Sequence, residues 1–419
     1  MPAAVLAAAV ACVVLALAPA ARAAAAAPPA CPASVTAPSA IVIEVSTLDV
    51  ACAKEPDARR EIASTTKLMT ALITLEHAKL SQRFRTSSYR PAAGESVIGL
   101  QPGERMQVRD LLRGLLVYSG NDAAMALASG VAGSPRAFVR MMNERARELE
   151  LHDTHYANPI GLDAPGNYSS ARDLARLALV LRTNPFVRET VDSPSTTLRT
   201  GAHPRTFRNR NTLVRDHAWV NGVKTGHTRQ AGYVLVGSGR RHGVQVVSAV
   251  LGTPGEVARD AQSLALLRAG VRAFQNITAA RPGSHVRGLG RVPIRYRPGA
   301  GLALQVGPNR VRVVVPRGKR SIVSLRPLKV PAEVEGPIRR GQRLGTAEVL
   351  RDGKRIAVVP LVAASAIPKA GAAQRVKAWF TRPLAVVLAF AVLGGTVLVA
   401  RRRRTGRPRR GSRREATPA

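Results

Sequence analysis

The stretch "ASTTKLMTAL", residues 63–72, places a serine and a lysine three positions apart at the start of an apolar run. If this run is a helix, Ser64 and Lys67 lie on the same face. Near a helix N-terminus, and partly buried, the lysine amine loses its charge and can take the proton of the serine hydroxyl. On this stretch alone, a serine cap followed by a solvated lysine is the preferred interpretation. Motifs elsewhere in the chain are needed to distinguish it from a catalytic Ser–Lys pair.

The composition is strongly basic. The chain has 419 residues, enough for two or three domains, and a formal net charge of +37. Such a charge is typical of nucleic-acid binding proteins. Apolar segments near both ends indicate export instead, and an exported basic surface faces polyanionic wall polymers and anionic lipid headgroups. We therefore expect no nucleic-acid partner.

The two ends predict how the protein is located. Residues 3–18 are apolar and are followed by "PAARA", which is typical of a secretory signal cleaved after Ala23. No Lys or Arg precedes this run, so cleavage and retention as an anchor both stay open. Residues 384–400 carry no charge and are followed by "RRRR" at 401–404, which predicts a transmembrane helix with the arginines in the cytoplasm. We expect a single-pass protein of the cell membrane with its catalytic domain outside.

Two of the three cysteines remain after the leader. Cys12 lies in the leader, whereas Cys31 and Cys52 follow it. In an oxidising compartment such a pair can form one disulfide, and two free buried thiols are the alternative.

The remaining patterns divide the chain into segments. Strand-like runs at 40–47 and 231–252 flank several helical patterns, which predicts an α/β layered domain. The "RRHG" sequence marks the turn of a hairpin in the second of these runs. From 281 to 369, short apolar runs alternate with Pro and Gly turns, which predicts a small all-β domain. The predicted boundaries are a signal peptide at 1–23, a flexible lead-in at 24–38, a catalytic domain at 39–276, an all-β domain at 277–369, a linker at 370–383, a transmembrane helix at 384–400 and a basic tail at 401–419.

Two further motifs follow the first in order. "YSGND" supplies Ser119 and Asn121 just before an apolar helix, and "VKTGHT" supplies Lys224 and its neighbours as the chain enters the hairpin. Each motif is weak alone, since Ser-Gly-Asn is a common turn. Ser-x-x-Lys, Ser-x-Asn and Lys-Thr-Gly in this order are typical of active-serine enzymes that recognise penicillin.

The sequence resembles the serine D-Ala-D-Ala carboxypeptidases, the low-molecular-mass penicillin-binding proteins. Similar segments include "REIASTTKLMTALI", "GESVIGLQPGERMQVRDLLRGLLVYSGNDAAMALA", "ANPIGLDAPGNYSSARDLARLAL", "RNRNTLV" and "VNGVKTGHTRQAGYVLVGSG". The β-rich part resembles that family's C-terminal domain through "PIRRGQRLGTAEVLRDGKRIAVVPLVA". The resemblance implies a β-lactamase/transpeptidase-like α/β fold, peptidoglycan stem peptides ending in D-Ala-D-Ala as substrates, and β-lactams as covalent inhibitors.

The resemblance also implies roles for the residues of the first two motifs. Ser64 attacks the carbonyl of the terminal D-Ala-D-Ala bond and becomes acylated. Lys67, neutral in a desolvated site, acts as the base for acylation and activates the deacylating water. Ser119 relays a proton towards the leaving amine, and the Asn121 amide holds Lys67 and the substrate backbone.

The third motif lines the opposite wall. Lys224 and Thr225 suit the C-terminal carboxylate of the substrate, and Gly226 keeps the strand free of a side chain so that the substrate can lie against it. Backbone N–H groups of Ser64 and His227 would form the oxyanion hole, for which the imidazole ring is not needed.

Arg259, in "EVARDAQ", matches by spacing an arginine that the family uses to bind the carboxylate. A guanidinium fork suits that task. A solvated helix arginine is the alternative, and the sequence leaves both open.

Rival functions are less well supported. A class A β-lactamase needs a Glu for deacylation, whereas "HYANPIGLDAPGNYSSARD" offers only Asp163 and Asp173. A D,D-endopeptidase or transpeptidase shares the acyl-enzyme chemistry. A non-catalytic wall-binding sensor would be expected to lose Ser64, Lys67 or the Lys224 strand first. We expect no metal and no cofactor, because the His residues are scattered and no phosphate loop or dinucleotide motif occurs.

Overall fold

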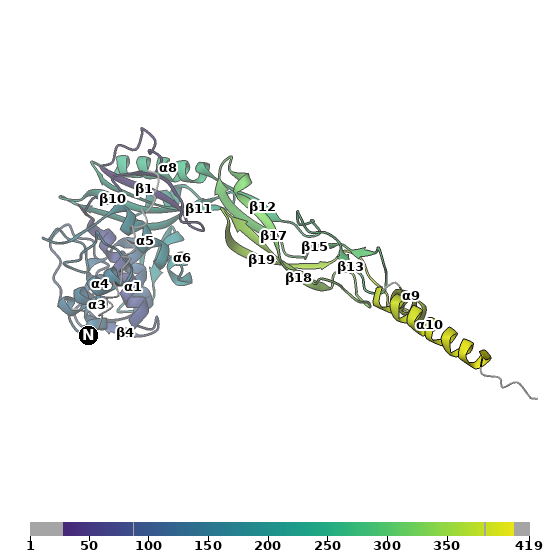
Figure 1. The fold of residues 1–419 in the computed structure, drawn as a ribbon. Coiled ribbons are helices and arrows are strands. Elements are labelled where there is room, and N and C mark those ends of the chain that lie inside the picture. The colour runs from purple at the N-terminus through teal and green to yellow at the C-terminus, as the bar shows by residue number, and fades with distance from the viewer. Residues whose placement is uncertain (1–27, 87, 381–382, 406–419) are drawn as a thin grey trace, which may run out of the picture.

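The computed structural model describes residues 28–86, 88–380 and 383–405. An α/β domain comes first, an all-β domain follows, and two helices end the described chain (Figure 1). The predicted signal peptide, 1–23, and residues 406–419 of the predicted basic tail lie outside the described residues.

The α/β domain is built on one five-stranded antiparallel sheet. Its strand order is β2-β1-β11-β10-β9, so strands from both ends of the domain lie side by side. The hairpin predicted around "RRHG" is confirmed, because β10 and β11 are joined at His242 and Gly243. The strands are β1 (Ser39–Glu44), β2 (Val50–Lys54), β9 (Val220–Thr228), β10 (Gly232–Arg241) and β11 (Val244–Thr253).

Both faces of the sheet are covered, which explains why β1 is buried along its whole length. Side chains alternate along a strand, so Ile41 and Ile43 enter one apolar core while Ala40 and Val42 enter the other. One face packs on α8 (Glu256–Ala273), and the opposite face packs on a group of helices that includes α1 and α5 (Figure 1). The helices before α8 are α1 (Lys67–His77), α2 (Val108–Arg113), α3 (Asn121–Ala132), α4 (Pro135–Glu148), α5 (Ala171–Leu181), α6 (Pro185–Asp192) and α7 (Thr212–Asp216).

Three short ribbons connect the helices. Each is a two-stranded antiparallel pair. They are formed by β3 (Arg60–Glu61) with β6 (Tyr168–Ser169), β4 (Arg83–Arg85) with β5 (Arg105–Gln107), and β7 (Ser195–Leu198) with β8 (Arg205–Arg208).

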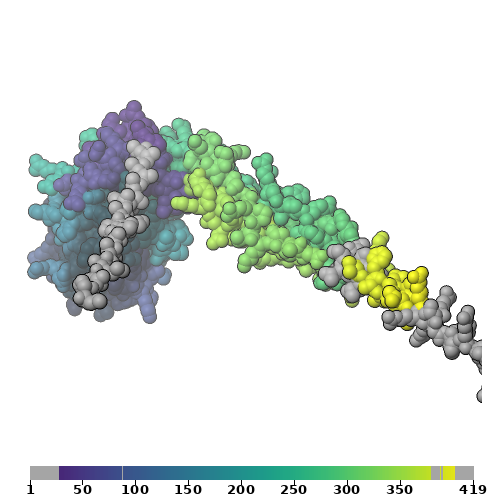
Figure 2. Space-filling view, in the orientation of Figure 1, coloured from purple at the N-terminus to yellow at the C-terminus, as the bar shows by residue number. Residues whose placement is uncertain are grey.

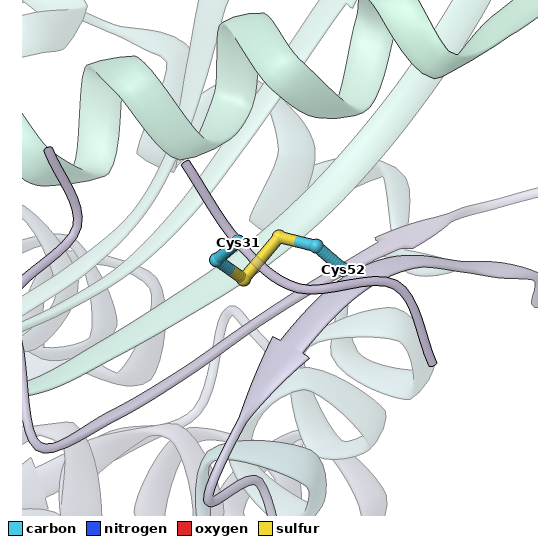
Figure 3. The surroundings of a disulfide bond; sticks show 2 residues. All are labelled: Cys31 and Cys52. Carbon is cyan, nitrogen blue, oxygen red and sulfur yellow. A yellow bond between two sulfur atoms is a disulfide. The ribbon is translucent and has the colours of Figure 1, made fainter. Parts of the chain in front are cut away.

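A disulfide joins the segment before β1 to strand β2. Cys31 and Cys52 are bonded, with their Cα atoms 5.0 Å apart, so the structure favours the bond over two free thiols (Figure 3). Val35 and Ala37 are buried, and the Ala37 N–H donates to Gln262 Oε1 at 2.7 Å. The described part of the lead-in is therefore packed against the domain, which differs from the flexible segment predicted for 24–38.

The all-β domain is confirmed, and its first strand begins earlier than expected. β12 (Phe274–Ala280) pairs with β16 (Val311–Pro316), so the boundary predicted between 276 and 277 falls inside a strand. A four-stranded sheet, β15-β19-β18-β17, and the β12–β16 pair contribute to one apolar core that is separate from those of the α/β domain. The other elements are β13 (Val292–Pro293), β14 (Gly301–Leu302), β15 (Leu304–Val306), the short 3-10 helix η3 (Arg320–Ile322), β17 (Val323–Lys329), β18 (Arg343–Arg351) and β19 (Lys354–Ala363).

Two helices follow the all-β domain (Figure 1), and the space-filling view shows this C-terminal segment, in yellow, at the end of the all-β domain away from the α/β domain (Figure 2). α9 (Ala372–Phe380) occupies most of the predicted linker, and α10 (Pro383–Thr405) contains the segment predicted to span a membrane. Within the described ranges, no helix combines the length and hydropathy needed to cross a bilayer. The transmembrane helix therefore stays a prediction.

Candidate active site

The first motif lies where a 3-10 helix runs into an α-helix. η1 (Ala63–Thr66) carries Ser64, and α1 begins at Lys67. The helix predicted from the sequence is present, but its first turn is tighter than an α-helix. Ala63 has a φ of 48°, an unfavourable value for a residue with a side chain, directly before the serine. Ser64 is half-buried and Lys67 is completely buried, which excludes the solvated lysine.

The Lys67 amine joins the serine to a backbone carbonyl. Its Nζ lies 2.9 Å from Ser64 Oγ and 2.5 Å from the carbonyl oxygen of Ile160. A carbonyl only accepts hydrogen bonds, so it takes an N–H of Lys67. Burial lowers the pKa of Lys67 to about 7, against the opposing effect of the carboxylates of Glu95 and Asp122. A neutral amine in this position can direct its lone pair at the serine hydroxyl.

A turn in the "ANPIGL" segment presents the Ile160 carbonyl. The Asn158 side chain accepts from the N–H groups of Ile160 and Gly161 at 3.2 Å and 2.6 Å, which fixes the turn. Gly161 has a φ of +82°, and a Cβ there would lie 2.0 Å from the Ala63 carbonyl oxygen. The turn therefore requires glycine, because its backbone presses directly on the segment that carries the serine.

The second motif enters between the other two. A π-helical turn, η2 (Gly114–Tyr118), contacts both α1 and β9 and leads into Ser119. Ser119 has a left-handed φ of 74° and is buried, and Asn121 is the buried first residue of α3. The amide Nδ2 of Asn121 donates to Glu95 Oε2 at 2.6 Å. Its Oδ1 has no hydrogen-bond partner within the described part of the chain, so the bond to Lys67 implied by the family resemblance is not formed here.

The third motif lies on β9, the edge strand of the sheet, which contacts η1. Lys224 is buried and donates to the carbonyl oxygen of Thr225 at 2.8 Å. Burial lowers the pKa of Lys224, and the charges of Lys67, Arg210 and Arg259 lower it further. Thr225 is also buried.

Gly226 has a different neighbour from the one predicted. A Cβ at this position would lie 3.1 Å from both the Ser64 backbone nitrogen and the Ile62 carbonyl oxygen. The missing side chain therefore lets the strand pack against the serine segment, rather than only leaving room for substrate. The exposed ring of His227 stacks on Tyr233, with ring centroids 4.0 Å apart.

The structure corrects one of the two interpretations of Arg259. The side chain is only 4% exposed, and it donates to Asp260 Oδ1 and Glu256 Oε1, both at 2.8 Å. It is therefore not a solvated helix arginine, and two carboxylates offset much of its charge.

Sequence reasoning missed Arg210, in the "RNRNTLV" segment. Its guanidinium lies 4.5 Å from the ring centroid of Tyr118, and its Nε donates to the Tyr118 carbonyl oxygen at 3.1 Å. It forms no ion pair with any carboxylate of the described residues, although it contributes to the lowered pKa of both Lys67 and Lys224. The quoted segment was a usable signal, but only the fold brings it beside the two lysines.

Asp163 and Asp173, the two acidic residues considered for a β-lactamase, accept hydrogen bonds from other parts of the domain. Asp173 accepts from the Asp153 N–H and the Thr154 hydroxyl, both at 2.8 Å, and burial raises its pKa. Asp163 accepts from the Gln230 N–H at 3.2 Å. Neither shares a hydrogen bond with Ser64 or Lys67 in the described structure. No cluster of His, Cys, Asp and Glu suited to a metal ion occurs within the described residues.

The chain is similar to known proteins over most of its length. Residues 22–255 match the family model described as D-alanyl-D-alanine carboxypeptidase, and residues 303–369 match the model described as penicillin-binding protein 5, C-terminal domain. The chain is similar to the D-alanyl-D-alanine carboxypeptidase DacF of Bacillus subtilis, with 31% identity over 80% of this chain and 87% of the relative. It is 32% identical to DacA of Escherichia coli over 80% of this chain and 84% of the relative. A crystal structure of penicillin binding protein 5 from Haemophilus influenzae covers 81% of this chain and 100% of its own, at 28% identity and a TM-score of 0.58.

The lowered pKa of Lys67 predicts the pH dependence of serine acylation. Only the neutral amine can accept the serine proton, so the acylation rate should rise about tenfold per pH unit below about 7 and level off above it. The measurement is the rate of covalent labelling by a fluorescent penicillin between about pH 5 and pH 9, which brackets the expected pKa. A rate that still rises about tenfold per pH unit between about pH 8 and pH 9 would contradict the assignment of Lys67 as a base with a lowered pKa.

Proposed function

The chain belongs to the D-alanyl-D-alanine carboxypeptidase family, and from that premise we propose how its residues divide the reaction. The protein is a serine-type D-Ala-D-Ala carboxypeptidase that removes the terminal D-alanine from peptidoglycan stem peptides, and β-lactam binding is consistent with this family. The observation that carries the assignment of residues is the contact between Ser64 Oγ and the buried amine of Lys67.

In the acylation step, Ser64 Oγ attacks the carbonyl carbon of the penultimate D-alanine. Lys67 takes the hydroxyl proton as the new C–O bond forms. The C–N bond to the terminal D-alanine then breaks, and its nitrogen receives a proton through the Ser119 hydroxyl. Support for this route comes from the buried position of Ser119 at the junction that contacts α1 and β9.

In the deacylation step, water attacks the ester on Ser64. Lys67, neutral again after the first step, takes a proton from the water and returns one to Ser64 Oγ. The oxyanion of each tetrahedral intermediate would receive hydrogen bonds from the backbone N–H groups of Ser64 and His227. The close packing of Gly226 against the Ser64 backbone nitrogen supports this pairing.

The terminal carboxylate of the substrate fits the cationic wall. Lys224 and Thr225 lie on the edge strand, and after burial the charges of Lys67, Arg210 and Arg259 also lower the pKa of Lys224. A bound carboxylate would offset this repulsion. We assign Arg210 rather than Arg259 as the main partner of the carboxylate. Arg259 already binds Glu256 and Asp260, so it acts on the site mainly through its charge.

Alternative functions share the first half of this chemistry. A D,D-transpeptidase or endopeptidase would form the same acyl-enzyme and differ in the acceptor or in the bond cleaved. A β-lactamase function is less well supported, because Asp163 and Asp173 accept hydrogen bonds from backbone N–H groups and share none with Ser64 or Lys67 in the described structure. A non-catalytic sensor is disfavoured because Ser64, Lys67 and Lys224 are all present and assembled.

We also propose that the protein is anchored in the cell membrane through the segment 384–400, with the catalytic domain outside. Exposed apolar side chains on α10, such as Phe390 and Leu393, and the arginines at 401–404 support this. The full chain should stay in the membrane pellet after an alkaline wash, whereas a chain ending at residue 383 should be released. Release of both forms would contradict the anchor and leave the chemistry untouched.

Replacing the nucleophile tests the function itself. Ser64→Ala should remove both the covalent penicillin adduct and the release of D-alanine from a pentapeptide ending in D-Ala-D-Ala, because no other group can form the ester. Ser324→Ala, an exposed serine on β17, is the control and should keep both activities. An adduct without D-alanine release in the wild type would favour a transpeptidase or a sensor.

Replacing the two arginines separates their roles. Arg210→Ala should lower kcat/KM for the pentapeptide by roughly 10- to 100-fold, because a charge-assisted hydrogen bond to the carboxylate is lost. It should also move the acid limb of the acylation profile to higher pH, since the charge of Arg210 lowers the pKa of Lys67. Arg259→Ala should have the smaller effect on KM. The opposite ranking would make Arg259 the carboxylate ligand.

A further inference from the structure

The loop between β4 and β5 places a carboxylate beside the catalytic motifs. Glu95 Oε2 accepts hydrogen bonds from Asn121 Nδ2 at 2.6 Å and from the Tyr89 hydroxyl, and its Oε1 accepts from the Ala92 N–H at 3.0 Å. The carboxylate is thus held from three directions. None of the three motifs includes it, and sequence reasoning did not identify it.

Glu95 is ionised at neutral pH. Partial burial by itself acts to raise its pKa, but hydrogen bonds from Tyr89, Asn121 and Ala92 and the nearby Lys67 outweigh this, so the pKa lies below its usual value. An ionised carboxylate can only accept hydrogen bonds. The end of the Asn121 amide that faces Glu95 must therefore be the NH2 group, and the opposite end must be the oxygen.

The backbone joins the same loop to the start of α3. The Asn121 N–H donates to the Ser96 carbonyl oxygen at 2.7 Å. In return, the N–H groups of Ile98 and Leu100 donate to the carboxylate of Asp122 at 2.9 Å and 3.0 Å. With both backbone and side chain fixed, the Asn121 side chain has little freedom to rotate.

The oxygen of the Asn121 amide remains available as a hydrogen-bond acceptor. Asn121 Oδ1 is buried and has no hydrogen-bond partner among the described residues. A buried acceptor without a donor is costly, and at an active site it marks a place for an incoming group. Lys67 Nζ and a substrate backbone N–H are donors of the required kind.

We propose that Glu95 is a positioning residue that fixes the Asn121 amide, so that its oxygen is presented to the N–H donors of the reaction. This inference rests on the proposed roles of Ser64, Lys67 and Asn121. It fixes the orientation of the amide: the oxygen accepts an N–H from Lys67 or from the substrate backbone, while one N–H of the nitrogen binds Glu95 and the second is left for another acceptor.

A double-mutant cycle tests the proposal on the full chain. Glu95→Ala should slow penicillin acylation of Ser64 by about tenfold, as expected when a hydrogen bond to a charged group is lost. Glu95→Gln should stay within about threefold of the wild type, because its side-chain carbonyl can still accept from Asn121 Nδ2. Glu95→Ala added to Asn121→Ala should cause no further loss, since residues that act through one another are not additive.

Several results would overturn the proposal. They are a wild-type acylation rate in Glu95→Ala, an equal loss in Glu95→Ala and Glu95→Gln, a full additional loss in the Asn121→Ala background, or a defect confined to deacylation. Glu61→Gln is the matched control. It removes an exposed carboxylate three residues before Ser64 and should leave the rate unchanged. A loss in this control equal to that of Glu95→Ala would show a general charge effect and would also count against the proposal.

A variant that does not fold must be distinguished from a folded variant that acylates slowly. Thermal melting identifies variants that do not fold, and if Glu95→Ala lacks the wild-type transition, the cycle is run with Glu95→Ser. A wild-type protein that forms no Ser64 adduct would contradict the proposed function. A wild-type protein that acylates normally while the Glu95 variants do the same would contradict only the present inference.

Discussion

The site depends on one buried amine. Lys67 is removed from solvent and lies between the Ser64 hydroxyl and the Ile160 carbonyl. An unpaired ammonium in this position would be costly, so burial favours the neutral form and makes the lysine a base near neutral pH. The serine needs this base, because its hydroxyl is a poor nucleophile while it keeps its proton.

The surrounding fold is arranged to keep the amine buried and aimed. The turn around Gly161 and the edge strand at Gly226 both pack on the backbone of the serine segment, and neither position has room for a side chain. η2 contacts both α1 and β9 and so places the second motif between the first and the third. The sheet itself supports this geometry because its edge strand, β9, is held by β10 and β11 behind it. Three segments distant in sequence thereby meet at one sheet edge.

Part of this was predictable from local sequence, and part required the fold. The spacing of Ser64 and Lys67 predicted a shared helical face, and alternation predicted the β10–β11 hairpin, because both are short-range properties. The Ile160 carbonyl had no signature, since every residue offers one. Glu95 and Arg210 became visible only when the fold placed them beside Asn121 and the lysines. The domain boundary was misplaced because β12 continues directly from α8 without a turn sequence.

The most direct test of this account is the pKa of Lys67 in the full-length protein. Selective 13C labelling of lysine side chains, with Lys67→Arg to assign the signal, allows its titration to be followed by NMR. The account predicts a midpoint of about 7. A midpoint near the ordinary lysine value of 10.5 would show that the amine stays charged at neutral pH, and Lys67 could not then be the base that activates Ser64.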